Sequence, residues 1–321
     1  MSLKKDMLAG LRAWVLSDKG VGKEVSPLSA KEVAYSVDWV RSVPFIALHL
    51  MCLGIFIVGW SPVAIAVCVG MYFVRMFFIT GFYHRYFSHR TFKANRFMQL
   101  LLALAGTSCT QKGPLWWAAH HRQHHKHSDD PEDPHSPDQH GIFWSHIGWI
   151  TDKRNFPTRM SLVPDLARFR ELRFLDQFDL LVPASMGVGM YFLGEFLSSN
   201  YPSLGTNGWQ MLIWGFFVST IFLLHGSCMI NSAAHLMGKQ NYKTGDQSRN
   251  SLILSLFTLG EGWHNNHHYY PATARQGFLW WELDITFYLL KVMSWLKLIR
   301  ALRPVPKLVL SARLRRSQIP G

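Results

Sequence analysis

Histidines recur at metal-ligand spacing in three parts of this chain. Two strings have the pattern HxxHH and a third has the pattern HxxxxH. Their histidines are His121, His124 and His125; His264, His267 and His268; and His84 and His89. On a helix, residues three and four positions apart lie on one face, so each HxxHH string gathers three imidazoles on one side. Imidazole nitrogen is a common ligand of zinc, copper, iron and nickel. The repeated spacing therefore predicts a metal centre.

One more histidine belongs with these strings. His235 follows Asn231 by four residues, which places both side chains on one helical face. With His235 the set has nine imidazoles. Because one metal ion takes about four to six ligands, nine imidazoles predict two ions. A structural zinc site is smaller and often contains Cys, and zinc has no redox chemistry. Iron, at two ions per chain, is the predicted cofactor.

The remaining histidines are interpreted as ordinary polar residues. We expect buried polar contacts or surface positions for five of them, namely His49, His127, His140, His146 and His225. His120 and His135 stay undecided. Two Glu-x-x-His strings end at His135 and His264, a spacing that carboxylate di-iron bundles use. Pro134 interrupts a helix at the first string, and Gly262 lies inside the second. Both strings are therefore interpreted as coincidences.

Blocks of apolar residues indicate a membrane protein. Hydrophobic residues make up 49% of the 321 residues, and they are concentrated in runs. Four runs approach or reach the length of a transmembrane helix, at about 44–60, 63–82, 180–197 and 209–230. We expect an all-α membrane protein with four transmembrane helices, as two hairpins, and a cytosolic helical cap that holds the dimetal site. The segment 278–299 is amphipathic and predicts a helix at the membrane interface.

The distribution of basic residues predicts the orientation. Segments 1–43, 82–179 and 231–321 carry 7, 13 and 12 Lys or Arg residues, whereas the loops 61–62 and 198–208 carry none. By the positive-inside rule, both termini and every histidine string face the cytoplasm. The net charge of +13 then suits an anionic membrane surface, and no nucleic-acid motif accompanies it. We expect three regions: a cytoplasmic arm (1–43), an integral-membrane domain (44–300) and a basic cytoplasmic tail (301–321).

The order of these motifs resembles the membrane-bound fatty acyl desaturases of the stearoyl-CoA Δ9 type, in their bacterial-like form. The matching stretches include Asn231-Ser-Ala-Ala-His235, Gly260-Glu-Gly-Trp-His-Asn-Asn-His-His268 and Trp144-Ser-His-Ile-Gly-Trp149. The resemblance implies that two irons are held by the nine histidines and, through a water, by Asn231. It implies O₂-dependent desaturation of a saturated acyl-CoA or lipid-linked acyl chain, most often at cis Δ9. It also implies a multi-pass protein of a bacterial inner membrane.

Some positions depart from this resemblance, and they concern the substrate. Animal acyl-CoA members have an Arg-Asp pair before the first His of HxxHH, where this chain has Ala119 and His120. His120, Lys153 and Arg154 are candidate headgroup contacts. Small residues before the first histidine of HxxxxH are replaced by Phe82 and Tyr83, which are candidate tunnel residues. Whether the chain acts on acyl-CoA or on a lipid-linked acyl chain stays open at this point.

The resemblance also implies a separate electron donor, such as ferredoxin or cytochrome b5 with its NAD(P)H reductase. A fatty acyl hydroxylase of the same superfamily is the alternative enzyme, because it begins from the same hydrogen abstraction. A membrane metal transporter or sensor is the alternative from another class. It would need polar ligands along the spans, and only His49 and His225 are histidines within them.

Overall fold

The structure is a computed structural model that describes residues 36–313, and this part of the chain is helical with no β-strand. Residues 1–35 of the predicted arm and residues 314–321 of the predicted tail lie outside the described residues. Of the arm, residues 39–43 already belong to the first span. Helix α2 (Trp39–Met51) begins before Pro44 because Asp38 caps it, its side chain accepting a hydrogen bond from the Arg41 amide. Pro44 lies inside the helix instead of at its start.

Four helical spans are long and apolar enough to cross a membrane, as the hydropathy predicted. They are Trp39–Val58, Pro62–Ser88, Leu181–Asn200 and Gly208–His235. The first consists of α2, η1 (Cys52–Gly54) and α3 (Ile55–Val58), and the second of α4 (Pro62–Phe77) and the π-helix η2 (Phe78–Ser88). The third is α11 (Leu181–Asn200). The fourth joins α12 (Gly208–Gln210), the π-helix η6 (Met211–Val218), α13 (Ser219–Ser232) and η7 (Ala233–His235).

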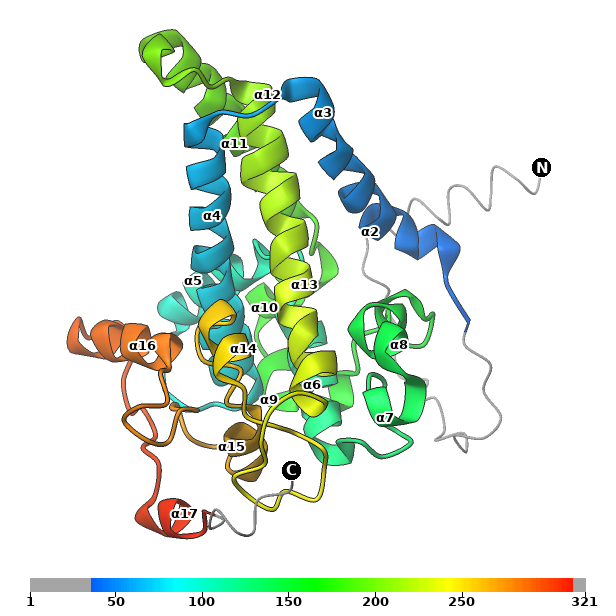
Figure 1. Cartoon of the computed structure of the whole chain (residues 1–321), viewed down its shortest axis with the longest axis vertical. Helices are drawn as coiled ribbons and strands as arrows, with labels where there is room; N and C mark the ends of the chain where they lie inside the picture. The colour runs from blue at the N-terminus through cyan, green and yellow to red at the C-terminus, as the bar shows by residue number, and fades with distance from the viewer. Residues whose placement is uncertain (1–35, 314–321) are drawn as a thin grey trace.

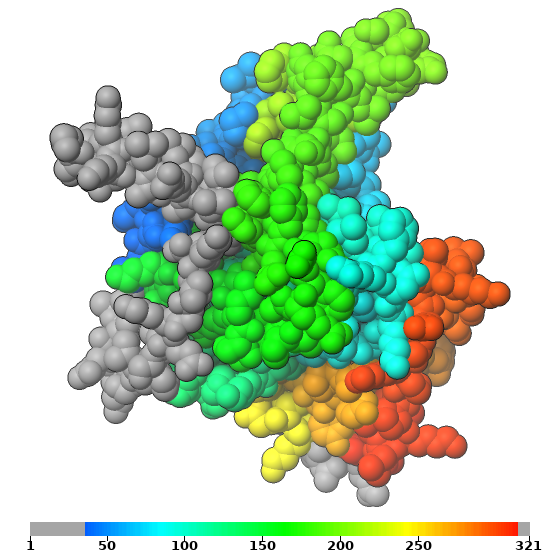
Figure 2. Space-filling view, turned by 180° about the vertical axis from the view of Figure 1, so that it is seen from behind, coloured from blue at the N-terminus to red at the C-terminus, as the bar shows by residue number. Residues whose placement is uncertain are grey.

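The spans rise from one side of a helical cap (Figure 1). Helices α4 and α13 pack together, while α2 and α3 lean away from them. Seen from behind, α11 rises from the cap with α5 (Arg96–Thr107) beside its base (Figure 2). Large apolar side chains stay exposed along the spans, for example Phe56, Phe192 and Phe222. In a membrane these side chains face lipid, so their exposure needs no partner protein.

The cap is built from short helices around α6 (Pro114–His127), which carries the first HxxHH string. The remaining helices there are α7 (Pro137–His140), α8 (Ile142–His146), η3 (Gly148–Thr151), η4 (Met160–Leu162), α9 (Pro164–Ala167), α10 (Arg170–Gln177), α14 (Leu252–Phe257), α15 (His264–Tyr269), α16 (Ile285–Trp295) and α17 (Lys307–Ser311); η5 (Pro202–Leu204) lies between α11 and α12. The predicted interfacial helix is α16, and it is shorter than 278–299. Trp280, Trp281 and Trp295 near it are exposed, as expected at a membrane interface.

Helix α6 is fixed at its start by a residue of another helix. The side chain of Asp176 in α10 accepts hydrogen bonds from the amides of Leu115 (3.0 Å) and Trp116 (2.8 Å). Pro114 occupies the first turn, where its missing N–H costs no helical hydrogen bond. Gly113 allows the close approach, because a Cβ there would lie 2.3 Å from the Cα of Asp176. These contacts set where the HxxHH string lies.

Candidate metal centre

The nine histidines meet at the base of the spans in two groups. Five ligand nitrogens lie within 4.8 Å of one another in the first group, which comprises His84, His89, His121, His125 and His267. The second group meets the same limit and comprises His124, His235, His264 and His268. We call them the five-histidine cluster and the four-histidine cluster. Each of the nine histidines singled out in the sequence lies in one of the two clusters.

Each HxxHH string contributes to both clusters. The first and last histidines of the α6 string, His121 and His125, join the five-histidine cluster, and the middle one joins the four-histidine cluster. The α15 string does the reverse, because His264 and His268 join the four-histidine cluster while His267 crosses to the other. Residues four apart point the same way along a helix, and the residue between them points to one side. The pattern therefore links the two clusters rigidly.

The imidazoles face one another through their Nε2 atoms. In the five-histidine cluster, Nε2 of His267 lies 2.9 Å from that of His84 and 2.8 Å from that of His125. In the four-histidine cluster, the Nε2 atoms of His235 and His264 are 3.1 Å apart. Two nitrogens that each bind one metal at about 2.0–2.1 Å approach to such distances. The donor set and its convergence fit a transition metal in each cluster.

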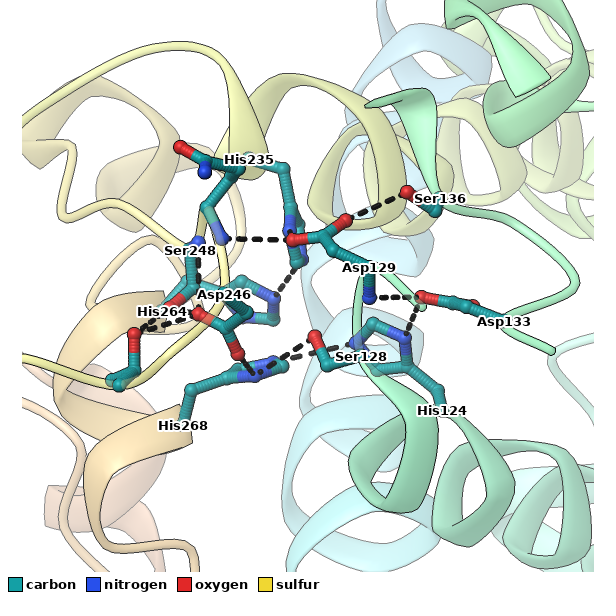
Figure 3. A network of polar contacts seen from close by, with 12 residues as sticks. His124, Ser128, Asp129, Asp133, Ser136, His235, Asp246, Ser248, His264 and His268 are labelled. Atoms are coloured by element: carbon teal, nitrogen blue, oxygen red, sulfur yellow. Dashed lines mark hydrogen bonds and ion pairs between the residues drawn. The ribbon is translucent and has the colours of Figure 1, made fainter. Parts of the chain in front are cut away.

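Buried carboxylates hold four of these rings from behind. Each accepts a hydrogen bond from the Nδ1 atom of one histidine, which turns Nε2 toward the cluster. The pairs are Glu261 with His84 (2.5 Å), Asp133 with His124 (2.9 Å), Asp129 with His235 (2.8 Å) and Asp246 with His268 (2.6 Å). Figure 3 shows the three aspartates around the four-histidine cluster. A carboxylate on the second nitrogen is typical of metal-ligating histidines, because it fixes the tautomer and the ring orientation.

Burial sets the protonation of the site. It lowers the pKa well below its usual range for His89, His121, His125, His264 and His267, and the neighbouring imidazoles add to the effect. Burial also opposes the charged forms of Asp133 and Asp246, but hydrogen bonds and adjacent histidines outweigh it and lower their pKa. These five rings therefore offer free lone pairs, and Asp133 and Asp246 carry negative charge.

Different elements bring these side chains to one place. His84 lies in the π-helix η2, and π-helical turns frequently mark functional sites. His235 ends the fourth span, and α15 supplies the second HxxHH string. Inside that string, Asn265 is fully buried and its Oδ1 accepts from the amides of Asn241 (2.7 Å) and Tyr242 (2.8 Å). Asn265 therefore anchors α15 while the histidines of the string face the clusters.

Two cavities connect this site with the spans. The smaller, about 50 Å³, is lined by His84, His121, His124 and His264 and by parts of α4 and α13. The larger, about 170 Å³, is mostly apolar and runs between α2, α6 and α13. Four residues line both cavities: Trp117, His121, Ser227 and Asn231. An elongated apolar group in the larger cavity thus reaches the five-histidine cluster and Asn231.

The sequence model of the fatty acid desaturase family matches residues 59–293, which include all nine clustered histidines. This chain belongs to that family. The desaturase is 33% identical over 263 residues to the sn-1 stearoyl-lipid 9-desaturase of Anabaena variabilis, covering 80% of this chain and 91% of the relative. It is 36% identical over 208 residues to the sn-2 palmitoyl-lipid 9-desaturase of Nostoc sp. (strain 36), covering 63% and 68%. It is also 32% identical over 291 residues to the acyl-CoA C20 Delta5-desaturase of Anemone leveillei, covering 85% and 87%.

The protein is therefore a membrane-bound oxidoreductase that desaturates fatty acyl chains. Its substrate is a lipid, and the histidine clusters suit a metal site.

The structure places the predicted substrate residues in different surroundings. His120 lines the larger cavity, with Nε2 3.1 Å from the Asn155 carbonyl oxygen, and its buried Nδ1 has no hydrogen-bond partner among residues 36–313. Lys153 and Arg154 line neither described cavity, and Arg154 pairs with Asp152 at 2.6 Å.

Phe82 and Tyr83 also stay outside both cavities. The ring of Phe82 stacks on Phe78. The hydroxyl of Tyr83 donates to the Lys112 carbonyl oxygen at 3.0 Å, and Lys112 lines the larger cavity. Tyr83 therefore contacts that cavity only through its neighbour.

Three histidines that we interpreted as ordinary form a chain of hydrogen bonds in the desaturase. Nδ1 of His49 donates to the Phe45 carbonyl oxygen at 2.8 Å, which leaves its Nε2 as the acceptor for His225 at 3.3 Å. His225 in turn lies 3.0 Å from Nε2 of His146 in α8. The chain ties α2 to α13 and to the cap. The sequence predicted polar contacts for these residues, but it did not predict which group His49 would contact.

Neither glutamate of the two Glu-x-x-His strings belongs to a histidine cluster, but one of them contacts a clustered histidine. Glu132 contacts neither cluster, whereas Glu261 pairs with His84 rather than with His264 of its own string. The four carboxylates behind the rings were missed by the sequence reasoning. The density of Asp residues in 129–133 was a signal for Asp129 and Asp133, and Glu261 belongs to a Glu-x-x-His string, but neither pattern indicates which histidine is contacted.

Proposed function

We propose that this desaturase introduces a cis Δ9 double bond into a saturated acyl chain carried by a membrane lipid. The observation that carries the proposal is the apolar cavity that runs from the α2 wall to His121 and Asn231. An acyl chain bound there would be held by the cavity walls, which would fix the carbons that face the site. The 9-desaturase names of two relatives support the position of the bond.

We assign two irons to the two clusters. The five-histidine cluster would hold one and the four-histidine cluster the other, with Asn231 acting through a water. Bound iron would supply the activation of O₂. Overall, the acyl chain loses two hydrogens, and one O₂ becomes two waters with two electrons and two protons from outside. Those electrons come from a separate carrier, such as ferredoxin or cytochrome b5 with its NAD(P)H reductase.

The lipid-linked substrate is favoured by the surroundings of the cavity. Arg41, Phe45 and Leu48 of α2 line it, and the outer face of α2 is exposed where lipid would lie. The positions of the acyl-CoA headgroup pair hold Ala119 and His120, both buried. Lys153 and Arg154, the remaining basic candidates, lie off the cavity. We therefore place access to the cavity on the bilayer side, with the cap facing the cytoplasm of a bacterial cell.

The product test uses expression in a host without desaturases of its own. Gas chromatography with mass spectrometry of dimethyl disulfide adducts should show cis Δ9 monounsaturated chains. Hydroxylated chains without new double bonds would instead identify a hydroxylase. Isolated membranes given labelled stearoyl-CoA or labelled phospholipid, with reduced ferredoxin, distinguish the headgroups. Desaturation of the CoA ester alone would contradict the lipid-linked substrate.

The metal test uses the full chain purified without oxygen. Metal analysis should give close to two irons per chain, and iron alone should restore activity to the metal-free protein. Zinc in an overexpressed preparation is not decisive, because nitrogen sites bind zinc more tightly than ferrous iron. Restoration of activity by zinc would contradict the assignment.

A further inference from the structure

The carboxylates behind the histidines are divided unequally between the two clusters. Three stand behind the four-histidine cluster, namely Asp129, Asp133 and Asp246, and one stands behind the five-histidine cluster, Glu261. Among the described residues, none of the other four rings of the five-histidine cluster has a carboxylate partner. The ligand atoms are imidazole nitrogens in both clusters, so the number of carboxylates behind them is the main difference in charge between the clusters.

Pairing of Glu261 with a basic residue increases the difference in negative charge between the two clusters. A guanidinium nitrogen of Arg85 lies 3.1 Å from Glu261, and Arg85 also pairs with Asp284. Arg85 is 1% exposed, so its charge acts in a poorly screened environment. No Lys or Arg within residues 36–313 pairs with Asp129, Asp133 or Asp246. Their other partners include hydroxyls and amides, for example Ser136 on Asp129 (2.8 Å) and Thr244 on Asp246 (2.7 Å), and the His135 imidazole lies 3.5 Å from Asp133.

These three aspartates are also shielded from water. The side-chain exposure is 0% for Asp133 and 8% for both Asp129 and Asp246. A buried negative charge attracts a nearby cation far more strongly than an exposed one, because the effective dielectric constant is lower. Each carboxylate also makes its histidine a stronger donor by accepting the Nδ1 proton.

We propose that the two metal positions differ in electrostatics, and that the negative charges of Asp133 and Asp246 strengthen metal binding at the four-histidine position. At the five-histidine position, metal binding relies on the larger number of ligands instead. This inference rests on the proposed dimetal function and adds a role for residues that are not ligands. Asp133 and Asp246 are positioning residues, since they act through His124 and His268. Asp129 is less suited to a test, because it also joins three segments of the cap.

The test isolates each position. In the full chain, His89→Ala/His125→Ala removes two ligands of the five-histidine cluster, and His235→Ala/His264→Ala removes two of the other. Metal-free protein of each background is titrated with Co²⁺ alone, and binding is followed by visible absorption. Asp246→Asn and Glu261→Gln are then added to each background. Asn and Gln keep the size and an acceptor oxygen, so the pair of variants compares the removal of one charge at each position.

We expect Asp246→Asn to weaken Co²⁺ binding by roughly 10–100-fold at the four-histidine position and to leave the five-histidine position unchanged. Glu261→Gln should have a smaller effect at its own position, because Arg85, which Glu261 shares with Asp284, offsets part of that charge. Equal losses for the two variants, or a loss from Asp246→Asn at the five-histidine position, would overturn the inference. Asp133→Asn gives an independent measurement if Asp246→Asn fails to fold. Normal Co²⁺ binding in both backgrounds, with equal effects of Asp246→Asn and Glu261→Gln, would overturn this inference and leave the dimetal proposal standing. No Co²⁺ binding in either background would overturn both the inference and the dimetal proposal.

Discussion

At the scale of the residue, His120 and His121 are adjacent and chemically alike, but they point to different places. Nε2 of His121 lies 2.8 Å from Nε2 of His89, whereas His120 contacts a backbone carbonyl and the larger cavity. His121→Ala should abolish turnover and lower the iron content. His120→Ala should keep both irons and mainly raise the KM for the lipid substrate. Metal analysis and steady-state kinetics of the two variants decide, and iron loss confined to His120→Ala would show that the assignment is reversed.

The nine histidines could be predicted individually, because eight belong to strings with recognisable spacing and His235 follows Asn231 by four residues. Their division into clusters could not, because it depends on how α6 and α15 face each other. The carboxylates were out of reach for a related reason. Asp246 lies more than 20 residues before its partner His268 in the sequence, in a segment without helical periodicity. Spacing reveals ligands that share a helix, but not groups that reach a ligand from another loop.

At the scale of the element, the attachment of α6 by Asp176 gives a prediction with a definite sign. Burial raises the pKa of Asp176 to about 6. Because this value lies above that of an unfolded Asp, about 3.9, the native state binds a proton that the unfolded state has released between these pH values. The contribution of Asp176 to the free energy of unfolding should therefore rise as the pH falls from about 6 to about 4.

Two variants of Asp176 separate its charge from its capping hydrogen bonds. Asp176→Asn keeps an acceptor for the Leu115 and Trp116 amides and should show a flatter dependence of Tm on pH than the natural protein. Asp176→Ala also loses the cap and should be about 0.5–2 kcal/mol less stable than Asp176→Asn at every pH. Thermal melts in detergent at pH 5 and pH 8 measure both. A Tm advantage of Asp176→Asn that grows toward pH 5 would contradict the raised pKa.

The elements themselves were largely predictable, and their ends were not. Hydropathy located all four spans, because lipid selects for long apolar runs. The first span begins at Trp39 because Asp38 caps it, and the second continues to Ser88 as a π-helix. Both ends depend on hydrogen bonds rather than on hydropathy. The same reason explains α16, whose start is fixed by Asp284 accepting from the Phe287 amide at 2.9 Å.

At the scale of the whole molecule, the two clusters lie where the spans meet the cap, so the site combines an aqueous face with an apolar cavity. The loops at the opposite ends of the spans are far from the clusters (Figure 1). This arrangement follows from the order of motifs in the sequence, since His84 and His235 come at the ends of the second and fourth spans. The sequence predicted a shared cap for this reason, but not the cavity wall formed by α2, which depends on the tilt of that helix.

The orientation of the molecule in the membrane can be determined with fusions at its loops and ends. Between α11 and α12 the chain passes through Gly205, in a loop whose segment 198–208 has no Lys or Arg. The cap segment 82–179 has 13 such residues, and each costs free energy to move across a membrane. An alkaline phosphatase fusion at Gly205 should therefore be active outside the cytoplasm. A fluorescent protein fused after Gly321 should fluoresce in the cytoplasm, and a protease site inserted after Lys153 should be cut only by a cytoplasmic protease. An inactive phosphatase at Gly205, together with a Lys153 site that a cytoplasmic protease leaves uncut, would place the cap and its histidines on the other side.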